Sequence, residues 1–283
     1  MLEGIHKIHL IGIGGSGMRA IANILIQKGY EVSGSDVKES DVIERFRQMG
    51  ATVHIGHNAD YVQGVDAVVR STAIREDNPE IVAAKEQGIT ILHRSDIVKA
   101  VLDVTNGIAV AGAHGKTSTT SMIGQILVEG QMEPTVIIGG EVDYLKGSSC
   151  LGKGEYSVVE ADESDGSFLK LRPKTIVITN IEDDHMDHYK TMENLLNAFC
   201  QFVETLPVDG KAVVCGDNDN IRYVMSKVER QFITYGLEES NDYVAKNIHY
   251  EDSSLVYDVV RKGETLSRVS LRVPGNHKDR KST

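Results

Sequence analysis

A short glycine-containing loop is the first feature of the sequence whose residue types could do chemistry. It has the form G-x-x-G-K-T, which is shorter than the usual phosphate-binding loop, because Val110 stands where that loop begins with glycine. In such loops backbone N–H groups converge on phosphate, while the lysine reaches the terminal phosphates and the threonine hydroxyl binds Mg²⁺. The sequence therefore predicts binding of nucleotide phosphates by Gly112, Ala113, His114, Gly115, Lys116, Thr117 and Ser118.

Two polar clusters follow later β-branched runs. The first comes at the end of Tyr156–Ala161 and consists of Glu160, Asp162, Glu163 and Asp165. The second follows Thr175–Thr179 and consists of Asn180, Asp184, His185 and Asp187. Taken singly, each could be an ordinary solvated loop. Because the carboxyl ends of parallel strands meet at one edge of a sheet, we expect both clusters to share a crevice with the phosphate loop.

A second glycine loop lies near the N-terminus. Residues Gly12–Gly17 match G-x-G-x-x-G between an expected strand and an expected helix, and Asp36 ends the next strand. This arrangement is typical of dinucleotide binding, with the pyrophosphate at the helix N-terminus and the acid on the ribose. The same N–H groups suit any diphosphate, including that of a UDP-sugar. An NAD-type cofactor, another nucleotide and a tight packing turn all remain open at this point.

The first half of the chain alternates strands with amphipathic helices, which indicates right-handed βαβ units and a mostly parallel sheet. The polar stretch Asp103–Gly107 is the expected boundary of a Rossmann-like domain over residues 1–106. The expected strands are Lys7–Ile11, Tyr30–Gly34, Ala67–Arg70 and Ile89–Leu92, and the expected helices are Met18–Lys28, Asp41–Met49 and Pro79–Gln87.

The alternation then repeats, which predicts a second α/β domain of the P-loop type over residues 107–283. From about Val244 strands follow one another without helices, which favours a small antiparallel extension. The expected strands are Ile108–Ala111, Val136–Ile138, Tyr156–Ala161, Thr175–Thr179, Lys211–Cys215, Leu255–Val260 and Leu266–Val273, and the expected helices are Lys116–Val128 and Met192–Thr205.

Composition narrows the possible partners. The formal net charge of −11 argues against nucleic acid, which requires a basic face. No apolar run approaches the roughly 20 residues of a membrane span, and the N-terminus lacks the pattern of a signal peptide. The three cysteines show no metal spacing and are expected to be reduced. We therefore expect a cytoplasmic protein, whose oligomeric state the sequence does not indicate.

The central motifs resemble those of the Mur ligase family. The segments that carry the likeness are Ala111–Thr120 (AGAHGKTSTT), Glu160–Phe168 (EADESDGSF) and Thr179–Asp187 (TNIEDDHMD). Segments of the first half are similar to the branch that adds L-alanine to UDP-N-acetylmuramate: GIGGSGM from Gly12, Gly34-Ser35-Asp36, Gly56-His57, STAI from Ser71, Asn78-Pro79-Glu80 and His93-Arg94-Ser95. The resemblance implies that the first loop holds the UDP-sugar, with contacts from Gly12, Gly14, Gly15, Ser16, Gly17, Met18, Asp36, Ser71, Ala73 and Arg94.

The resemblance also implies a reaction. The lactyl carboxylate of UDP-N-acetylmuramate attacks the γ-phosphate of ATP, and L-alanine then attacks the resulting acyl phosphate. The resemblance implies that Lys116, Glu160 and His185 act in catalysis, with Thr117, Glu160 and His185 as Mg²⁺ ligands and Asn180 and Asp184 in support. Imidazole is an unusual ligand for Mg²⁺, which prefers oxygen. His114 could face the substrate or pack within the loop.

Three alternatives remain. A murein-peptide recycling ligase shares the central motifs, an NAD-dependent oxidoreductase would explain only the first loop and Asp36, and folate-type ligases lack the first domain. The family also continues after Pro274-Gly275-Asn276-His277 into a third domain, for which the segment Lys278–Thr283 leaves no room. From the sequence alone we therefore expect this chain to bind the UDP-sugar but to be catalytically incomplete.

Overall fold

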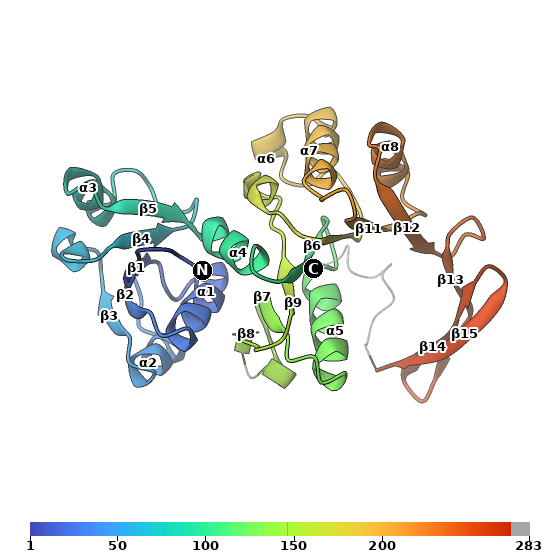
Figure 1. Cartoon of the computed structure of the whole chain (residues 1–283), viewed down its shortest axis with the longest axis horizontal. Helices are drawn as coiled ribbons and strands as arrows, with labels where there is room; N and C mark the ends of the chain where they lie inside the picture. Colours follow the sequence, from blue (N-terminus) through green and yellow to red (C-terminus); the bar gives the residue numbers. More distant parts are fainter. Residues whose placement is uncertain (146, 273–283) are drawn as a thin grey trace.

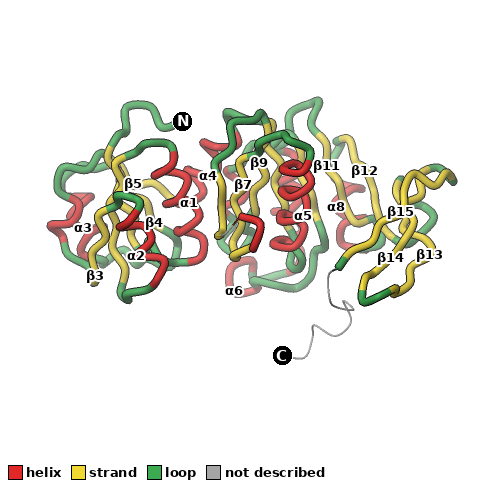
Figure 2. The backbone as a smooth tube through the Cα atoms, turned by 90° about the horizontal axis from the view of Figure 1, so that it is seen from below, coloured by secondary structure: helices red, strands yellow, loops and turns green. Residues whose placement is uncertain are grey.

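The structure is a computed structural model that describes residues 1–145 and 147–272. In this part of the chain two β-sheets lie side by side, with α1 (Ser16–Gln27) and α4 (Arg94–Leu102) between them (Figure 1, Figure 2). The α/β class expected from the sequence is confirmed. The expected strand end at Val273 and the segment Pro274–Thr283 fall outside the described residues.

The first sheet is wholly parallel, with the strand order β3-β2-β1-β4-β5. Its central strand is therefore the one that leads into the first glycine loop. The remaining helices of this part are α2 (Asp41–Gln48), α3 (Pro79–Glu86) and the 3-10 turn η1 (Ala59–Val62). The strands are β1 (Lys7–Ile11), β2 (Glu31–Asp36), β3 (Thr52–Ile55), β4 (Ala67–Arg70) and β5 (Thr90–His93).

Apolar side chains cover both faces of this sheet. Ile21 and Ile24 of α1 and Phe46 of α2 belong to the large core that continues into the second half of the molecule. On the opposite face, Ile81 of α3 packs with Ile11 in a separate, smaller cluster. A parallel sheet buried on both sides leaves its carboxyl edge as the natural place for a ligand.

The second sheet is mixed, with the order β15-β14-β13-β12-β11-β10-β6-β9-β7-β8. Its centre is parallel, β8 pairs antiparallel with β7 at one edge, and β13 to β15 form the expected antiparallel extension. The strands are β6 (Asn106–Ala111), β7 (Thr135–Val142), β8 (Gly147–Cys150), β9 (Tyr156–Glu160), β10 (Thr175–Ile178), β11 (Lys211–Cys215), β12 (Gln231–Gly236), β13 (Tyr243–Glu251), β14 (Ser254–Arg261) and β15 (Glu264–Leu271).

Helices cover both faces of the parallel centre, and the extension projects away from the first sheet (Figure 1, Figure 2). Ile123 and Leu127 of α5 pack on Val110 and Val158 on one face. Helices α7 and α8 belong to the larger core on the other face. The helices are α5 (Lys116–Glu129), α6 (Met186–Tyr189), α7 (Met192–Glu204) and α8 (Asp219–Lys227), with 3-10 turns η2 (Asp143–Leu145) and η3 (Ser167–Lys170).

Polar contacts fasten α1 to the second sheet. The Asn23 amide donates to the carbonyl and hydroxyl oxygens of Ser149 on β8, both at 3.0 Å, and the Ser149 hydroxyl donates to Ala20 O at 2.9 Å. Near the start of the same helix, Arg19 forms an ion pair with Glu141 at 2.6 Å. The helix that follows the first glycine loop is therefore held directly against the sheet that carries the second loop.

A buried carboxylate organises the polar interior of the first sheet. Glu80 has zero exposure, and its Oε2 accepts from the Ser35 hydroxyl at 2.7 Å and lies 3.3 Å from His9 Nε2. Burial alone would raise the pKa of the Glu80 carboxyl, but hydrogen bonds from His9 and Ser35 outweigh it and hold this pKa below its usual value. A fully bonded carboxylate of this kind stabilises the folded chain at neutral pH.

Replacing this carboxylate tests that conclusion. Glu80→Gln should lower the free energy of unfolding at pH 7 by about 1–3 kcal/mol, because an amide NH₂ would face donors that need an acceptor. The folded pKa of Glu80 lies below the unfolded value of about 4.3, so its stabilisation is complete above that pH and is lost as the pH falls further. Urea unfolding of both chains should show a difference that shrinks below about pH 4. A difference that widens there would contradict this reasoning.

Candidate active site

The loop between β6 and α5 has a backbone that only glycine allows at its first position. Gly112 has a φ of +132°, and a Cβ there would lie 2.3 Å from Thr179 Oγ1 and 2.8 Å from Asn180 O. Gly115, with a φ of +84°, caps the start of α5 and has open space around it. The helix therefore begins at Lys116, and Thr117 and Ser118 lie exposed in its first turn.

Asn180 holds the loop from the neighbouring strand. Its Oδ1 accepts from His114 N at 2.9 Å, and its Nδ2 donates to His114 O at 2.9 Å. The Thr179 hydroxyl also donates to His114 O, at 2.6 Å, and Ala113 N donates to Asn180 O at 3.3 Å. Because β10 pairs directly with β6, the second polar cluster sets the shape of the loop. The His114 ring itself is largely exposed and lies 3.5 Å from Glu182.

Lys116 points back across the mouth of the loop. Its Nζ donates to Gly112 O at 2.7 Å and to Glu163 Oε1 at 2.6 Å. The Glu163 side chain is only 2% exposed, and its other oxygen has no hydrogen-bond partner. Burial raises the pKa of Glu163, although the charge of Lys116 opposes that shift. Sequence reasoning placed Glu163 in the acidic cluster but gave it no role; its signal was its position next to the strand end.

Glu160 is the second carboxylate of this edge, and it is partly buried. It ends β9, contacts the Thr117 hydroxyl and the Gly139 N–H, and keeps one oxygen, Oε1, without a partner. Burial raises the pKa of Glu160, and these hydrogen bonds and the charge of Lys116 lower it only in part. A buried carboxylate oxygen without a donor is costly unless a ligand completes it.

His185 stands beside Glu163 rather than beside Glu160. Its Nε2 lies 3.6 Å from Glu163 Oε1 and 3.7 Å from Asp184 Oδ2. The residue has a φ of +56°, which is uncommon outside glycine, and Asp184 Oδ1 accepts its backbone N–H at 2.8 Å. Asp184 therefore fixes the backbone of His185, as a supporting residue would.

These oxygen donors suit a hard divalent cation. Glu160 and Glu163 each present an unpartnered buried oxygen, and the Thr117 hydroxyl touches Glu160. Carboxylate and hydroxyl oxygens are the donors that Mg²⁺ prefers. Within residues 1–145 and 147–272, however, no three His, Cys, Asp or Glu side chains converge on one metal position. The structure thus brings Thr117 and Glu160 together and leaves His185 as a partner of Glu163.

In the first glycine loop, the Asp36 carboxylate hydrogen-bonds to the backbone of the loop itself. Gly14 N donates to Asp36 Oδ2 at 2.9 Å, and the N–H groups of Gly12 and Ile13 donate to Ser35 O. Gly12 has a φ of +72°, which glycine adopts without strain. Gly15 caps α1, Ser16 begins the helix, and Met18 is buried in the core. Met18 can therefore act on a ligand only through its backbone or the packing of the loop.

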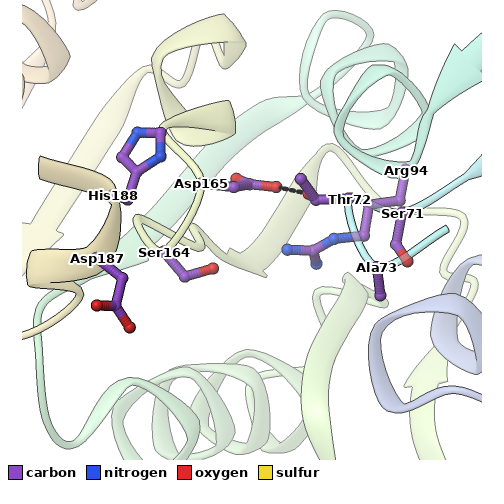
Figure 3. Close-up of a pocket in the computed structure, with 8 residues that line it drawn as sticks. All are labelled: Ser71, Thr72, Ala73, Arg94, Ser164, Asp165, Asp187 and His188. Atoms are coloured by element: carbon purple, nitrogen blue, oxygen red, sulfur yellow. Dashed lines mark hydrogen bonds between the residues drawn. The ribbon is translucent and has the colours of Figure 1, made fainter. Parts of the chain in front are cut away.

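A pocket of about 540 Å³ joins the two halves of the molecule (Figure 3). In Figure 3 the side chains of the first half and those of the second half line opposite sides of this pocket. Of the residues expected to contact the UDP-sugar, Ser71, Ala73 and Arg94 line this pocket. Thr72, Asp165 and His188 also line it, although the sequence analysis did not single them out as site residues. The lining residues are Ser71, Thr72, Ala73, Arg94, Ser164, Asp165, Asp187 and His188.

Ionic and polar contacts cross this pocket. Arg94 pairs with Asp162. The Thr72 hydroxyl donates to Asp165 (Figure 3). A Cβ on Gly17 would lie 2.9 Å from Arg94 Nη1, so the first glycine loop approaches the same guanidinium. Arg94 is therefore the cation between the first glycine loop and the acidic segment after β9.

Comparison with known proteins assigns the family. Residues 7–104 match the model "Mur ligase family, catalytic domain", and residues 110–278 match "Mur ligase middle domain". The chain belongs to the Mur ligase family. Curated relatives named UDP-N-acetylmuramate--L-alanine ligase include one from Desulfatibacillum aliphaticivorans, 43% identical over 96% of this chain, and one from Geobacter sulfurreducens, 43% identical over 98%. The chain spans about 60% of the length of each.

Solved structures of Mur ligases share the fold. The UDP-N-acetylmuramate-alanine ligase from Thermotoga maritima aligns with a TM-score of 0.84 and 29% identity, over 96% of this chain and 62% of that one. A UDP-N-acetylmuramate:L-alanyl-gamma-D-glutamyl-meso-diaminopimelate ligase from Neisseria meningitides aligns with a TM-score of 0.87 and 26% identity, over 97% and 90%. The family expected from the motifs is thus confirmed.

The relatives and solved structures named above are ligases, so the likeness of the first glycine loop to a dinucleotide-binding loop does not by itself indicate an oxidoreductase. Among the described residues, no helix has both the length and the apolar character that a transmembrane segment needs.

The two loop glycines provide a matched test of the phosphate loop. Gly112→Ala should lower the free energy of unfolding by about 3 kcal/mol or more, because backbone strain of about 1–2 kcal/mol adds to a steric clash of similar size. Gly115→Ala should cost only the strain, since nothing lies within 4 Å of its Cβ position. Urea denaturation measures both. Equal losses in the two variants would mean that β10 does not constrain the loop.

Proposed function

We propose that this Mur ligase catalyses the ATP-dependent ligation of L-alanine to the lactyl carboxylate of UDP-N-acetylmuramate, in the cytoplasm, as a step of peptidoglycan synthesis. The observation that carries the proposal is the pocket through which the UDP-sugar side and the phosphate-loop side meet at Arg94. The names of the relatives with 41–45% identity support L-alanine as the amino acid.

The UDP-sugar would lie along the carboxyl edge of the first sheet. Its diphosphate fits the N–H groups of Ser16 and Gly17 at the start of α1, where the helix dipole favours anions, whereas the Gly15 N–H already donates to Gly12 O. The muramoyl part would then extend into the pocket, where Ser71 and Arg94 offer a hydroxyl and a cation. Arg94 would exchange Asp162 for an anionic group of the substrate, since both contacts use the same guanidinium.

ATP would place its phosphates on the second loop. Lys116 would turn from Glu163 to the terminal phosphates, and Gly115, Lys116 and Thr117, at the start of α5, would contribute N–H groups, since those of Ala113 and His114 already donate to Asn180. Mg²⁺, when bound, supplies positive charge against the phosphate oxygens. Thr117 and Glu160 are the residues that would hold it, because their oxygens already meet and one remains unpartnered. His185 would take part at a second position beside Glu163, with Asp184 and Asn180 fixing the loops around it.

The chemistry then has two steps. A lactyl carboxylate oxygen attacks the γ-phosphorus, the bond to the bridging oxygen of ADP breaks, and an acyl phosphate forms. The amine of L-alanine attacks the carbonyl carbon, and inorganic phosphate and a proton leave. The main obstacle is the approach of one anion to another, so catalysis rests on positive charge placed in advance. Lys116 provides that charge at the phosphate and Arg94 at the acid side.

A murein-peptide ligase activity is the second candidate. The Neisseria ligase described above joins UDP-N-acetylmuramate to a peptide, and its structure aligns closely with this chain. Both candidates share the UDP-sugar and differ in the second substrate. The curated relatives favour L-alanine, and offering the free amino acid and the tripeptide in parallel would decide between them.

We also propose that each sheet with its helices forms one domain, the first over residues 1–106 and the second from residue 107. The strands of the first sheet all precede α4, and the second sheet begins with β6. The proposed division falls after the first residue of that strand, Asn106.

Calorimetry on the 283-residue chain tests the binding half of the proposal. UDP-N-acetylmuramate and UDP should bind saturably, because the first loop and the pocket offer N–H donors and Arg94 to their anionic groups. NAD should show no heat of binding at the same concentrations. Saturable binding of NAD in place of UDP would overturn the assignment of the first loop.

The phosphate loop is tested by removing its charge. Lys116→Gln keeps a hydrogen-bond donor beside Glu163 but removes the cation, so the dissociation constant for ATP with Mg²⁺ should rise at least tenfold. Binding of UDP-N-acetylmuramate should change less than twofold. Lys174→Gln is the matched control, since the exposed Lys174 only contacts Asn106 and should leave both affinities unchanged. Equal weakening of both ligands by Lys116→Gln would mean that the two loops are not separate sites.

A further inference from the structure

The buried network around Glu80 reaches the ligand-binding edge of the first sheet through one histidine. His57 follows β3, and its Nδ1 lies 3.2 Å from Glu80 Oε1 and 3.2 Å from the Ser35 hydroxyl oxygen. Asn58 N donates to the same Glu80 oxygen at 3.3 Å. The His57 side chain is 22% exposed, whereas that of Glu80 is fully buried. An imidazole on the surface is thus anchored to a carboxylate in the core.

These contacts fix the tautomer of His57. An ionised carboxylate only accepts hydrogen bonds, so Glu80 requires a proton on His57 Nδ1. The Ser35 hydroxyl gives its only proton to Glu80 at 2.7 Å and can therefore only accept from His57. Both neighbours demand the same Nδ1–H form. In neutral imidazole the other nitrogen, Nε2, then carries a lone pair, and no described residue donates a hydrogen bond to it.

The strand order places His57 at the side of the first sheet where the nucleoside of such a ligand would lie. The glycine loop follows the central strand β1, and the pocket residues Ser71 and Arg94 follow β4 and β5 on one side of it. Asp36 ends β2 and His57 follows β3, on the other side. A diphosphate on the loop with its sugar acid in the pocket must therefore direct its nucleoside towards β2 and β3. In that direction the ligand would reach Asp36 first and His57 next.

We propose that His57, held in the Nδ1–H form by Glu80, accepts the N3–H of uracil and so selects uridine over cytidine nucleotides. The inference rests on the proposed function, because it concerns the base of the same UDP-sugar. Uracil carries a donor at N3, whereas cytosine carries a lone pair there, which would face the lone pair of His57 Nε2. Glu80 acts as a positioning residue, since it reaches the base only through His57.

The affinities of UDP and CDP for the 283-residue chain measure this selection. We expect UDP to bind at least tenfold more tightly than CDP, because a site that is built to pair with an N–H group rejects an analogue without it. His57→Ala should bring the ratio to within about threefold. His54→Ala is the matched control: His54 lies on β3 and stacks on Tyr61, with ring centroids 3.9 Å apart, and its loss should leave the ratio unchanged.

Two Glu80 variants separate positioning from folding. In Glu80→Gln the side-chain carbonyl should remain opposite Asn58 N–H and His57 Nδ1, so the UDP preference should survive even though stability falls. Glu80→Met removes that acceptor, and the preference should fall at least fivefold. Nitrogen-15 NMR of the histidine rings at pH 8 should show His57 in the Nδ1–H form in the unmodified and Gln chains, but not in the Met chain. Dispersed amide spectra would verify that each variant is folded.

Three results would contradict the inference alone, and a fourth would contradict the proposed function as well. Equal affinities for UDP and CDP in the unmodified chain would overturn the inference while leaving the ligase proposal standing. So would an unchanged ratio in His57→Ala, or an Nε2–H signal from His57 in the unmodified chain. Failure of the chain to bind either nucleotide would overturn the proposed function and this inference together.

Discussion

The buried ion pair between Lys116 and Glu163 is the interaction on which the catalytic edge depends. It draws the lysine across the phosphate loop and ties β6 to the segment after β9. Burying the Glu163 carboxylate alone would be strongly unfavourable, and the charge of Lys116 opposes the rise that burial causes in its pKa. A phosphate that displaces Glu163 from Lys116 would leave that carboxylate without a cation, and this couples nucleotide binding to the acidic groups around it.

The contacts between the sheets serve a second requirement, which is to keep two anionic ligands at a defined separation. On the α1 side the buried contact is uncharged, through Asn23 and Ser149, and the Arg19–Glu141 ion pair is added at its more exposed end. On the pocket side it is ionic, through Arg94 and Asp162. Neutral hydrogen bonds between buried groups are not displaced by an anion, whereas an arginine can change partners. We therefore expect substrate binding to rearrange the pocket side and leave the α1 side intact.

The sequence allowed the loops and their strands to be predicted because both depend on local signals. β-branched runs followed by glycine fixed Lys7–Ile11 and Lys211–Cys215 to the residue. The strands β3, β8 and β12 and the helices α4, α6 and α8 escaped prediction, since their stability comes from neighbours. His93, for example, caps α4 through a reciprocal bond with Asp96, a role in which serine or aspartate is usual. Pairings such as Thr72 with Asp165 join residues far apart in the chain and have no periodic signature.

The carboxylates of the two sheets differ in their hydrogen bonding, and this difference indicates which sheet edge would bind a cation. Glu80 is satisfied by protein donors on both oxygens, and its pKa is lowered despite complete burial. Glu163 is similarly buried and Glu160 is partly buried, yet each keeps a buried oxygen without a donor and a raised pKa. A carboxylate whose two oxygens already accept hydrogen bonds from the protein gains no further interaction from a cation. A carboxylate that keeps one oxygen without a donor gains that interaction when a cation binds. Positive charge is therefore drawn to the second sheet, where a triphosphate would bring it, while the first sheet recognises its ligand through hydrogen bonds already oriented.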